Sequence, residues 1–363
     1  MGTVEVNGLR KSFGAVQALD GVTLDVPDGS FFVVLGPSGA GKTTTLRAIA
    51  GLEKLDAGTV HLDGRDATGD SPADRDLAMV FQSYALYPRL TAYENIASPL
   101  RARRRSSSEI AAAVERMSSL LHIERLLQRR PAQMSGGEMQ RVALARALVR
   151  NPRAFLMDEP LTNLDLKLRV EMRTELTRIH RSLGGTFVYV TNDQVEALSM
   201  ADYVAILKEG KVQQVGTPAE VYERPANQWV AGFVGSPAIS LLACRAEGDR
   251  LIGAAGWTLP RPRWTTAEDG RPLLLGLRAE DLSVERRGDA SLQGELYGLE
   301  PLGDRTLVDV QVGTEILKVK ARPTVTGTPG ERLQVTVDLD RAHLFDAGTG
   351  LALTEITGGR RNA

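Results

Sequence analysis

This sequence has little of what marks secreted or membrane-spanning proteins. Its single cysteine, Cys244, excludes an internal disulfide, and such a residue is expected to fill core space rather than act as a nucleophile. No apolar run approaches the ~18 residues that a membrane-spanning helix needs. The first residues, MGTVEVNGLRKSF, lack the apolar core of a signal peptide. Any role at a membrane is therefore expected to depend on a partner.

Charge and aromatic content argue against nucleic-acid binding. The 363 residues carry 44 basic and 45 acidic side chains, so no bulk attraction to nucleic acid or anionic lipid is expected. The few aromatic residues between 240 and 363 do not alternate with basic ones as a nucleic-acid surface would require; they are Trp257, Trp264, Tyr297 and Phe345. Hydrophobic content of 42% is ordinary for a globular protein, and the length allows two or three domains.

Hydrophobic periodicity predicts how the chain is organised. The first part combines alternating antiparallel-strand patterns with continuous apolar runs typical of buried parallel strands, among them residues 77–82. Helical spacing over about 88–150 predicts a helical insert, with separate patterns at 92–105, 107–121, 123–131 and 138–151. Its basic stretch 101–108 is expected to be the solvated end of a helix, with a binding patch as the alternative. From residue 239 on, short strand patterns predict an all-β, barrel-like domain.

The stretch GPSGAGKTT (residues 36–44) follows a buried strand pattern and precedes a helical one. It matches G-x-x-x-x-G-K-[ST] in the context that a phosphate-binding loop requires. The glycines let main-chain N–H groups converge on phosphate oxygens, and the helix start adds its positive end. Lys42 would contact the β- and γ-phosphates, and the Thr43 hydroxyl would ligate Mg²⁺.

A second buried strand pattern, AFLMDEP, ends in two adjacent acids. Asp158 at the strand tip is placed to hold the magnesium shell, and Glu159 to orient or deprotonate a water that attacks the γ-phosphate. Such a pair has little specificity alone. Together with the Lys42 loop it predicts hydrolysis of a bound nucleotide.

The stretch MSGGEMQRVALARAL predicts a second helix start suited to an anion. Ser135 is a good N-cap, and Gly136 and Gly137 keep side chains away from the main-chain N–H groups. An ordinary capped helix is the alternative. One nucleotide on the Lys42 loop does not need two helix ends from one chain, whereas two copies arranged head to tail would use both.

Five ordered stretches resemble those of ABC-transporter ATPases: GPSGAGKTT, MVFQSYALYP, MSGGEMQRVALARAL, FLMDEPLTNLDLKLR and VTNDQVEALSMAD. The chain is most similar to the maltose-transporter ATPase group, which powers import of sugars, polyols and related solutes. The stretches GTPAEVYERPANQWVAGFVGSP and GLRAEDL extend the resemblance over essentially the whole chain. It implies an α/β P-loop NTPase in residues 1–235 (mixed-sheet core, antiparallel β subdomain, helical subdomain), followed by an all-β OB-like regulatory domain in residues 236–363.

The resemblance also implies roles for individual residues. Glu159, Gln82 and Asn192 would be catalytic, and Thr43, Gln82 and Asp158 would hold Mg²⁺. Ser135 to Gly137 would cap the γ-phosphate of the opposite subunit, and Asp165 would lie in the loop that crosses the dimer interface. The residues implied in binding ATP are Phe13, Gly36, Pro37, Ser38, Gly39, Ala40, Gly41, Lys42, Thr43, Thr44, Ser135, Gly136, Gly137, Glu138 and Asp165.

Partners and location follow from the same resemblance. It implies an ATP-dependent homodimer on the cytoplasmic face of the cell membrane, bound to transmembrane permease subunits and served through them by an extracytoplasmic solute-binding protein. The string from Tyr84 to Pro88 falls where relatives receive a short permease helix, with packing of the helical insert as an equal alternative. A soluble ABC protein of repair or translation, and a regulatory module that binds ATP without turnover, are the competing functions.

Three residues depart from the pattern of the family. Met134 replaces leucine at similar volume, and Glu138 replaces glutamine, which suits the helix dipole but adds like charge near the nucleotide. Asn192 replaces a histidine that bonds the γ-phosphate, and asparagine can carry neither positive charge nor a shuttled proton. Losing a charge-assisted bond would cost ~1.5–3 kcal/mol, or ~10- to 100-fold in rate. A natural slow ATPase, a deliberately disabled variant and an enzyme that fills the histidine role elsewhere all stay open.

Overall fold

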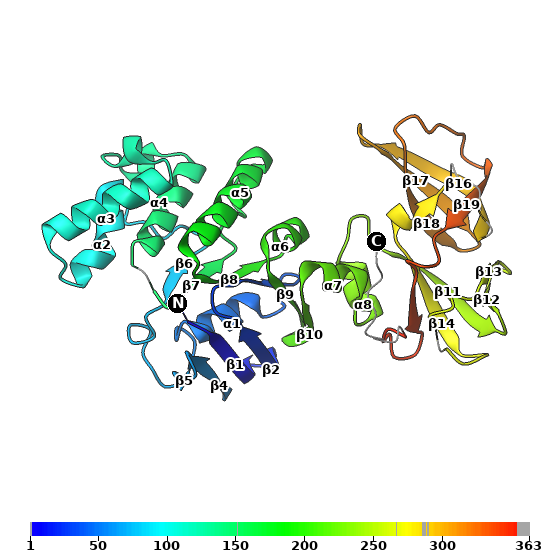
Figure 1. Ribbon diagram of the computed structural model, residues 1–363, viewed down its shortest axis with the longest axis horizontal. Helices are drawn as coiled ribbons and strands as arrows, with labels where there is room; N and C mark the ends of the chain where they lie inside the picture. Colours follow the sequence, from blue (N-terminus) through cyan, green and yellow to red (C-terminus); the bar gives the residue numbers. More distant parts are fainter. Residues whose placement is uncertain (1, 151, 266, 285–287, 289, 354–363) are drawn as a thin grey trace. The chain divides into compact units, whose positions relative to one another are not determined.

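The computed structural model describes residues 2–150, 152–265, 267–284, 288 and 290–353, and they form two compact units, Met1–Ala219 and Glu220–Ala363 (Figure 1). This division comes earlier than the predicted domain boundary at 235/236, which stays a prediction. The connector helix α8 (Gln228–Phe233) belongs to the second unit. Arg278 of that unit donates to the carbonyls of Tyr222 at 2.7 Å and Val234 at 2.8 Å, which fastens the connector to the β domain.

A six-stranded sheet forms the centre of the first unit, in the order β10-β9-β3-β8-β7-β6. All neighbours pair in parallel except β9 and β10. The bounds are β3 (Phe31–Leu35), β6 (Ala78–Val80), β7 (Ala154–Asp158), β8 (Thr186–Thr191), β9 (Tyr203–Lys208) and β10 (Lys211–Gly216). β3, β7 and β8 are buried throughout, as their continuous apolar runs predict. The predicted strand 77–82 is wrong in length, because pairing stops at Val80 and leaves Gln82 beyond the strand.

A smaller antiparallel sheet, β2-β1-β4-β5, shares one core with the larger sheet. Its strands are β1 (Val4–Phe13), β2 (Val16–Val26), β4 (Ala57–Leu62) and β5 (Arg65–Asp66). Helix α1 (Lys42–Ile49) belongs to this core, because buried Leu46 and Ile49 cluster with side chains of both sheets. The helix that follows the phosphate loop is thereby fixed in place.

Three helices form a group of their own beside the larger sheet (Figure 1). They are α2 (Ala92–Ala102), α3 (Ser107–Leu120) and α4 (Gly136–Leu148), and they confirm the helical insert. The predicted helix at 123–131 is wrong: the chain makes 3-10 turns at Glu124–Leu126 and Pro131–Gln133, since a residue before proline disfavours the α conformation. The basic stretch 101–108 is exposed, as expected for a solvated helix end.

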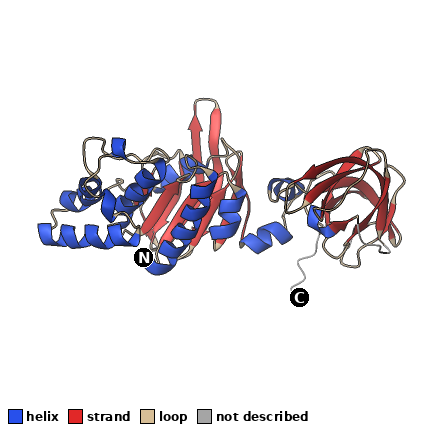
Figure 2. Ribbon diagram, turned by 90° about the horizontal axis from the view of Figure 1, so that it is seen from above, coloured by secondary structure: helices blue, strands red, loops and turns tan. Residues whose placement is uncertain are grey.

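Two helices follow the remaining strands of the sheet. They are α5 (Leu166–Leu183) after β7 and α6 (Gln194–Met200) after β8, and helices flank the strands in Figure 2. The short helix α7 (Pro218–Glu223) begins the connector. Among the helices of the described residues, none is both long and apolar enough to cross a bilayer.

The second unit contains two five-stranded antiparallel sheets that curve around a common core (Figure 2). The first has β11 (Ser240–Glu247), β12 (Arg250–Gly253), β13 (Thr258–Pro260), β14 (Pro272–Leu277) and β20 (His343–Asp346). The second has β15 (Leu282–Ser283), β16 (Ser291–Pro301), β17 (Thr306–Val312), β18 (Glu315–Ala321) and β19 (Arg332–Val337). Cys244 is buried in this core, and burial raises the pKa of its thiol to about 11, as expected for a core-filling cysteine.

Candidate active site

The predicted catalytic stretches all follow neighbouring parallel strands. The strands β3, β8, β7 and β6 lie side by side in that order, and the cross-strand pairs Leu35–Thr191 and Val190–Asp158 keep their ends level. Carboxyl ends of parallel strands form one edge of a sheet, where α/β proteins bind ligands. The phosphate loop, Asn192, Glu159 and Gln82 therefore meet at one edge although they lie far apart in the sequence.

The phosphate loop has the backbone that its glycines predict. Gly41 is the N-cap of α1, with φ of 99° and no side-chain cap. A Cβ there would lie 2.4 Å from the Ala18 carbonyl oxygen, and one at Gly36 would lie 2.3 Å from that of Leu207. Gly39 has φ of 79°. The first-turn N–H groups of α1 are thus left for an anion.

Five of the predicted residues make contacts with one another at the start of α1. The Lys42 Nζ donates to the Pro37 carbonyl at 3.0 Å and lies 3.5 Å from the Glu159 Oε1. The Thr43 hydroxyl donates to the Asp158 Oδ1 at 2.9 Å. Burial raises the pKa of Asp158. Among the other loop residues Ala40 is buried, Pro37 and Thr44 are half-buried, and Ser38 is exposed.

Gln82 lies just beyond β6, with an exposed side chain. Its carbonyl oxygen accepts a hydrogen bond from the Asn163 Nδ2 at 3.0 Å. Asn163 belongs to the TNLD stretch after Glu159, so the main chain of Gln82 is tied to the segment that follows the predicted catalytic residue Glu159. Glu159 itself has φ of 42°, a conformation that is costly for a residue other than glycine.

Asn192 is exposed on a turn that buried groups hold in place. The Asp193 carboxylate caps α6 by accepting from the N–H groups of Val195 and Glu196, at 2.8 and 3.1 Å. The buried Glu196 carboxylate accepts from the hydroxyls of Tyr189 and Thr191, each at 2.7 Å. Burial raises the pKa of Glu196. Position 192 thus combines a fixed backbone with room for a larger side chain.

The start of α4 satisfies part of its own hydrogen bonding. The Ser135 hydroxyl accepts from the Glu138 N–H at 3.3 Å, and the Glu138 carboxylate accepts from the Ser135 N–H at 3.0 Å. This main-chain bond lowers the pKa of Glu138. A Cβ on Gly137 would lie 2.2 Å from the Leu168 Cδ2, whereas one on Gly136 would meet only ordinary contacts. No hydrogen bond or ion pair among the described residues connects the phosphate loop with residues 135–138.

Phe13 and Asp165 lie outside the contacts around Lys42. Phe13 is 49% exposed, and the Lys11 Nζ lies over its ring, 5.1 Å from the ring centroid. Asp165 is the N-cap of α5, where its carboxylate accepts from the Leu168 N–H at 3.0 Å. Asp165 therefore has a structural task within its own chain.

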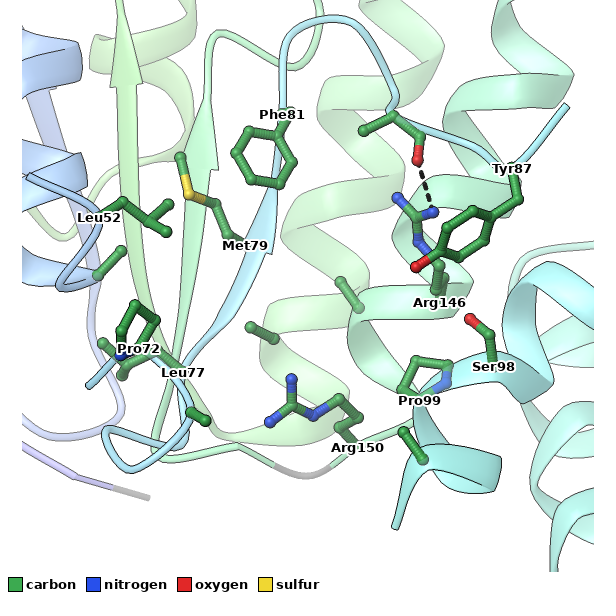
Figure 3. A pocket seen from close by; sticks show the side chains of 16 residues that line it. Leu52, Pro72, Leu77, Met79, Phe81, Tyr87, Ser98, Pro99, Arg146 and Arg150 are labelled. Atoms are coloured by element: carbon green, nitrogen blue, oxygen red, sulfur yellow. Dashed lines mark hydrogen bonds between the residues drawn. The ribbon is translucent and has the colours of Figure 1, made fainter. Parts of the chain in front are cut away.

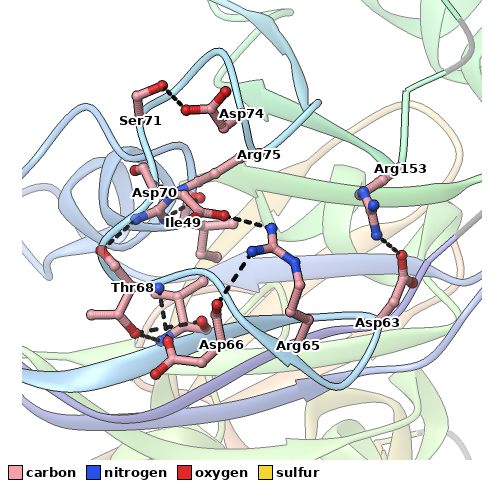
Figure 4. Close-up of polar contacts among 11 residues, drawn as sticks. Ile49, Asp63, Arg65, Asp66, Thr68, Asp70, Ser71, Asp74, Arg75 and Arg153 are labelled. Atoms are coloured by element: carbon pink, nitrogen blue, oxygen red, sulfur yellow. Dashed lines mark hydrogen bonds and ion pairs between the residues drawn. The ribbon is translucent and has the colours of Figure 1, made fainter.

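Arg75 is a positioning residue that the sequence did not reveal. It is 3% exposed and donates to the carbonyls of Ala48 and Ile49, both at 2.7 Å, and of Thr68 at 2.9 Å (Figure 4). These bonds satisfy the carboxyl end of α1, whose amino end carries Lys42. A Cβ on Gly51 would lie 2.8 Å from the Arg75 Nε, which explains the glycine.

A groove of about 540 Å³ lies between the end of α1, the strand β6 and the helical group (Figure 3). The predicted string from Tyr84 to Pro88 contributes Ala85 and Tyr87 to its lining. The lining is mostly apolar and consists of Ala50, Leu52, Pro72, Ala73, Leu77, Ala78, Met79, Phe81, Ala85, Tyr87, Ser98, Pro99, Ala102, Arg146, Ala147 and Arg150.

Known proteins resemble this chain over its full length. The sulfoquinovosyl glycerol transport ATP-binding protein SmoE of Agrobacterium fabrum is 46% identical, over 96% of this chain and 99% of SmoE. The chain belongs to the ABC transporter family. The family model "ABC transporter" matches residues 19–162 of this ABC ATPase, and the "TOBE domain" model matches residues 275–345.

Other relatives and solved structures agree with this assignment. The sn-glycerol-3-phosphate import ATP-binding protein UgpC of Cereibacter sphaeroides and the trehalose/maltose import ATP-binding protein MalK of Thermococcus litoralis are each 43% identical, over 97% of this chain and 100% of each relative. The dimeric structure of the bacterial ABC transporter cassette MJ0796 is similar with a TM-score of 0.55 and 32% identity, over 59% of this chain and 98% of the cassette. The predicted family, fold class and ATPase activity are confirmed.

Proposed function

We propose that this ABC ATPase powers import of a sugar, a polyol or a glycerol derivative through separate permease subunits. Two copies would close on ATP, each joining its Lys42 loop to the Ser135 helix start of the other. One observation carries the proposal: Lys42, Thr43, Asp158 and Glu159 assemble within one chain, while Ser135 does not join them. The relatives' names, which mention import of glycerol phosphate and of trehalose or maltose, support the solute class.

The contacts around Lys42 suggest how ATP binds. Triphosphate oxygens would compete with Glu159 for the Lys42 ammonium, which frees the Glu159 carboxylate to orient or deprotonate the attacking water. Gln82 would touch the same water, and the exposed ring of Phe13 would stack on adenine. Head-to-tail pairing would bring Ser135, Gly136 and Gly137 of the second copy to the γ-phosphate, with Asp165 at the interface.

The donor set at the strand edge fits a magnesium ion. Thr43 and Asp158 are already in contact, and together with Gln82 they offer only oxygen ligands, which Mg²⁺ prefers. Asp158 is buried and its pKa is raised, so a nearby divalent charge would favour its ionised form. Bound there, the ion would neutralise charge on the β- and γ-phosphate oxygens.

The apolar groove supports a membrane partner. A short permease helix would fit among Phe81, Ala85 and Tyr87, which flank or belong to the segment that begins with Gln82. We place the protein at the cytoplasmic face of the cell membrane through this contact, with an extracytoplasmic solute-binding protein delivering the solute to the permease.

Asn192 favours a second candidate, a slow or regulatory ATP-binding subunit. Its amide can donate to a phosphate oxygen but cannot carry the charge of a histidine. ATP binding and pairing would persist, because they rest on many other contacts. Steady-state phosphate release separates the two candidates: an importer motor turns over continuously, while a regulatory module releases phosphate at no more than a background rate.

Pairing tests the proposal directly. The Glu159→Gln variant should form a dimer with Mg-ATP in light scattering, and its hydrolysis should fall by ~100- to 10,000-fold because the base is lost. In that background Ser135→Ala should weaken pairing at least ~10-fold, as expected for a lost bond to a charged phosphate.

The chain offers a matched control for this substitution. Ser106 caps α3 with Glu109 in the same capping box that Ser135 forms with Glu138. Ser106→Ala should therefore cost similar helix stability and leave pairing unchanged. Failure of Glu159→Gln to pair, or equal pairing of the two serine variants, would contradict the proposed sandwich.

A further inference from the structure

Arg146 binds the segment that links the groove to Gln82. Its Nη1 donates to the Ala85 carbonyl at 2.7 Å and its Nη2 to the Tyr84 carbonyl at 2.9 Å. Figure 3 shows the guanidinium beside the groove, where its Cζ lies 5.7 Å from the Tyr87 ring centroid. In the part of the chain that the structure describes, Arg146 has no carboxylate partner and neither carbonyl has another donor.

The two residues that Arg146 holds are strained. Tyr84 has φ of 61° and Ala85 has φ of 49°, so two successive residues with side chains adopt the left-handed conformation. Such a conformation is costly outside glycine and persists only where surrounding contacts enforce it. Arg146 supplies two contacts at this place, and its charge makes both bonds stronger than bonds between neutral groups.

The rest of the segment is fixed at both ends by other elements. Asn163 donates to the Gln82 carbonyl before the strained pair. Asn95 of α2 exchanges two hydrogen bonds with the main chain of Tyr87 after it, at 2.8 and 3.2 Å. In the middle of the segment, the Tyr84 N–H donates to the Phe81 carbonyl at 3.0 Å and the Ala85 N–H to the Ser83 carbonyl at 2.7 Å. The two bonds from Arg146 add to these and join the strained backbone to helix α4.

Arg146 also connects this segment with the other end of its own helix. It lies on α4, a helix of 13 residues that begins directly after Ser135. Phe81, Ala85, Tyr87 and Arg146 all line the groove. Helix α4 therefore follows Ser135 at its start and, through Arg146 near its end, hydrogen-bonds the segment that lines the groove.

We propose that Arg146 is a positioning residue that holds the Gln82 segment in its strained form and thereby sets both the place of Gln82 and the shape of the groove wall. The inference rests on the proposed function, since that function gives Gln82 and the groove their roles. Arg146 acts through the main chain of Tyr84 and Ala85 and touches no reacting atom.

Hydrogen exchange on the full chain tests the contact. Arg146→Lys keeps the charge but replaces a planar group that donates from two nitrogens with a single ammonium nitrogen. The amides between residues 82 and 87 should exchange at least ~10-fold faster, because local opening of this segment becomes easier. Arg141→Lys is the matched control: Arg141 lies on the same helix, and none of the hydrogen bonds of the described residues joins it to this segment.

Kinetics and a rescue variant distinguish positioning from general stability. In Arg146→Lys the kcat should fall ~10-fold while KM for ATP stays within ~2-fold, because the Lys42 loop is untouched. Ala85→Gly removes the penalty of the left-handed backbone, since glycine adopts it freely. Added to Arg146→Lys, it should restore both the slow exchange and most of the kcat.

Unchanged exchange at 82–87 in Arg146→Lys would overturn the inference. So would faster exchange across all of α4 that Ala85→Gly does not reverse, because that pattern reports a loss of packing. The wild-type chain separates this failure from failure of the proposed function: pairing and hydrolysis with Mg-ATP test the latter without any change at Arg146.

Discussion

Two helix starts in this protein are built in opposite ways. Helix α1 begins at Gly41, which has a left-handed backbone and offers no side-chain cap. Helix α4 begins at Ser135, where a capping box with Glu138 satisfies two main-chain donors. The N–H groups of Gly136 and Gly137 are not part of that box. The first turn of α1 has no side-chain acceptor from its own N-cap, whereas the first turn of α4 is satisfied in part by Ser135 and Glu138.

This difference fits a protein that binds ATP as a single copy before it pairs. An uncapped helix start with a buried lysine can receive phosphate at once. A capped start keeps α4 stable while no partner is present, because unsatisfied first-turn donors would weaken the helix. The comparison predicts that changes at α1 affect ATP binding by the single chain, and that changes at α4 affect only pairing or helix stability.

Among the substitutions at the two helix starts, Lys42→Ala should have the largest effect on ATP binding. The affinity of the dilute, unpaired chain for ATP should fall ~10- to 100-fold, the cost of a lost charge-assisted contact, and hydrolysis should stop with it. Titration calorimetry measures the affinity. Ser135→Ala should leave the same affinity within ~2-fold. Equal losses in both variants would show that the two helix starts do not differ in this way.

Asn192→His should have the next largest effect, at the strand edge that also carries α1. The exposed position and the fixed turn give a histidine room, and a charged donor to the γ-phosphate should raise turnover at least ~10-fold, or ~1.4 kcal/mol in the barrier. Phosphate release under saturating Mg-ATP measures it. The same substitution in the Glu159→Gln background should give no gain, and an unchanged rate in the wild-type background would refute the prediction.

Contiguous motifs made much of this site predictable. The glycines of the phosphate loop and the serine before α4 take their geometry from their own backbone or immediate neighbours, while Asp158 ends β7 and Glu159 follows it directly. A few adjacent residues therefore determine the local geometry of each stretch. The parallel order of β3, β8, β7 and β6 then brings the separate stretches to one edge.

Residues that bind distant main-chain carbonyls were not predictable. Arg75, Arg146 and Asn163 donate to carbonyl oxygens far away in the sequence, and every residue type offers the same carbonyl. The only available sign was a charged residue inside an apolar stretch, as Arg146 is in VALARALV. The prediction of a helix at 123–131 was wrong for two reasons. The pattern of Ile123 and Leu126 fits one short turn as well as a longer helix, and Pro131 disfavours the α conformation at Arg130.

The two glycines at the start of α4 should respond differently to alanine. Gly137→Ala places a Cβ against Leu168 and should lower stability by ~1 kcal/mol, at the low end for overpacking because the half-exposed Leu168 can rotate. Gly136→Ala meets only ordinary contacts and should be neutral or slightly stabilising, since alanine favours helix. Thermal unfolding measures both. Adding Leu168→Ala should remove the cost at position 137, and a persistent cost would mean that Leu168 is not its cause.

Glu138→Gln should have the smallest effect near neutral pH, within ~0.5 kcal/mol, because an amide oxygen can still accept from the Ser135 N–H. The difference should appear in acid. The folded-state pKa of Glu138 lies below its ordinary value of 4.5, so its contribution to stability is present above 4.5 and is lost as the pH falls through the folded-state value. The glutamine variant should lose less stability over that interval. Glu109→Gln, in the matching box of α3, should behave alike, since its pKa is lowered by the same kind of bond to Ser106. A pH profile identical to wild type in the Glu138→Gln variant would show that the carboxylate does not cap α4 in solution.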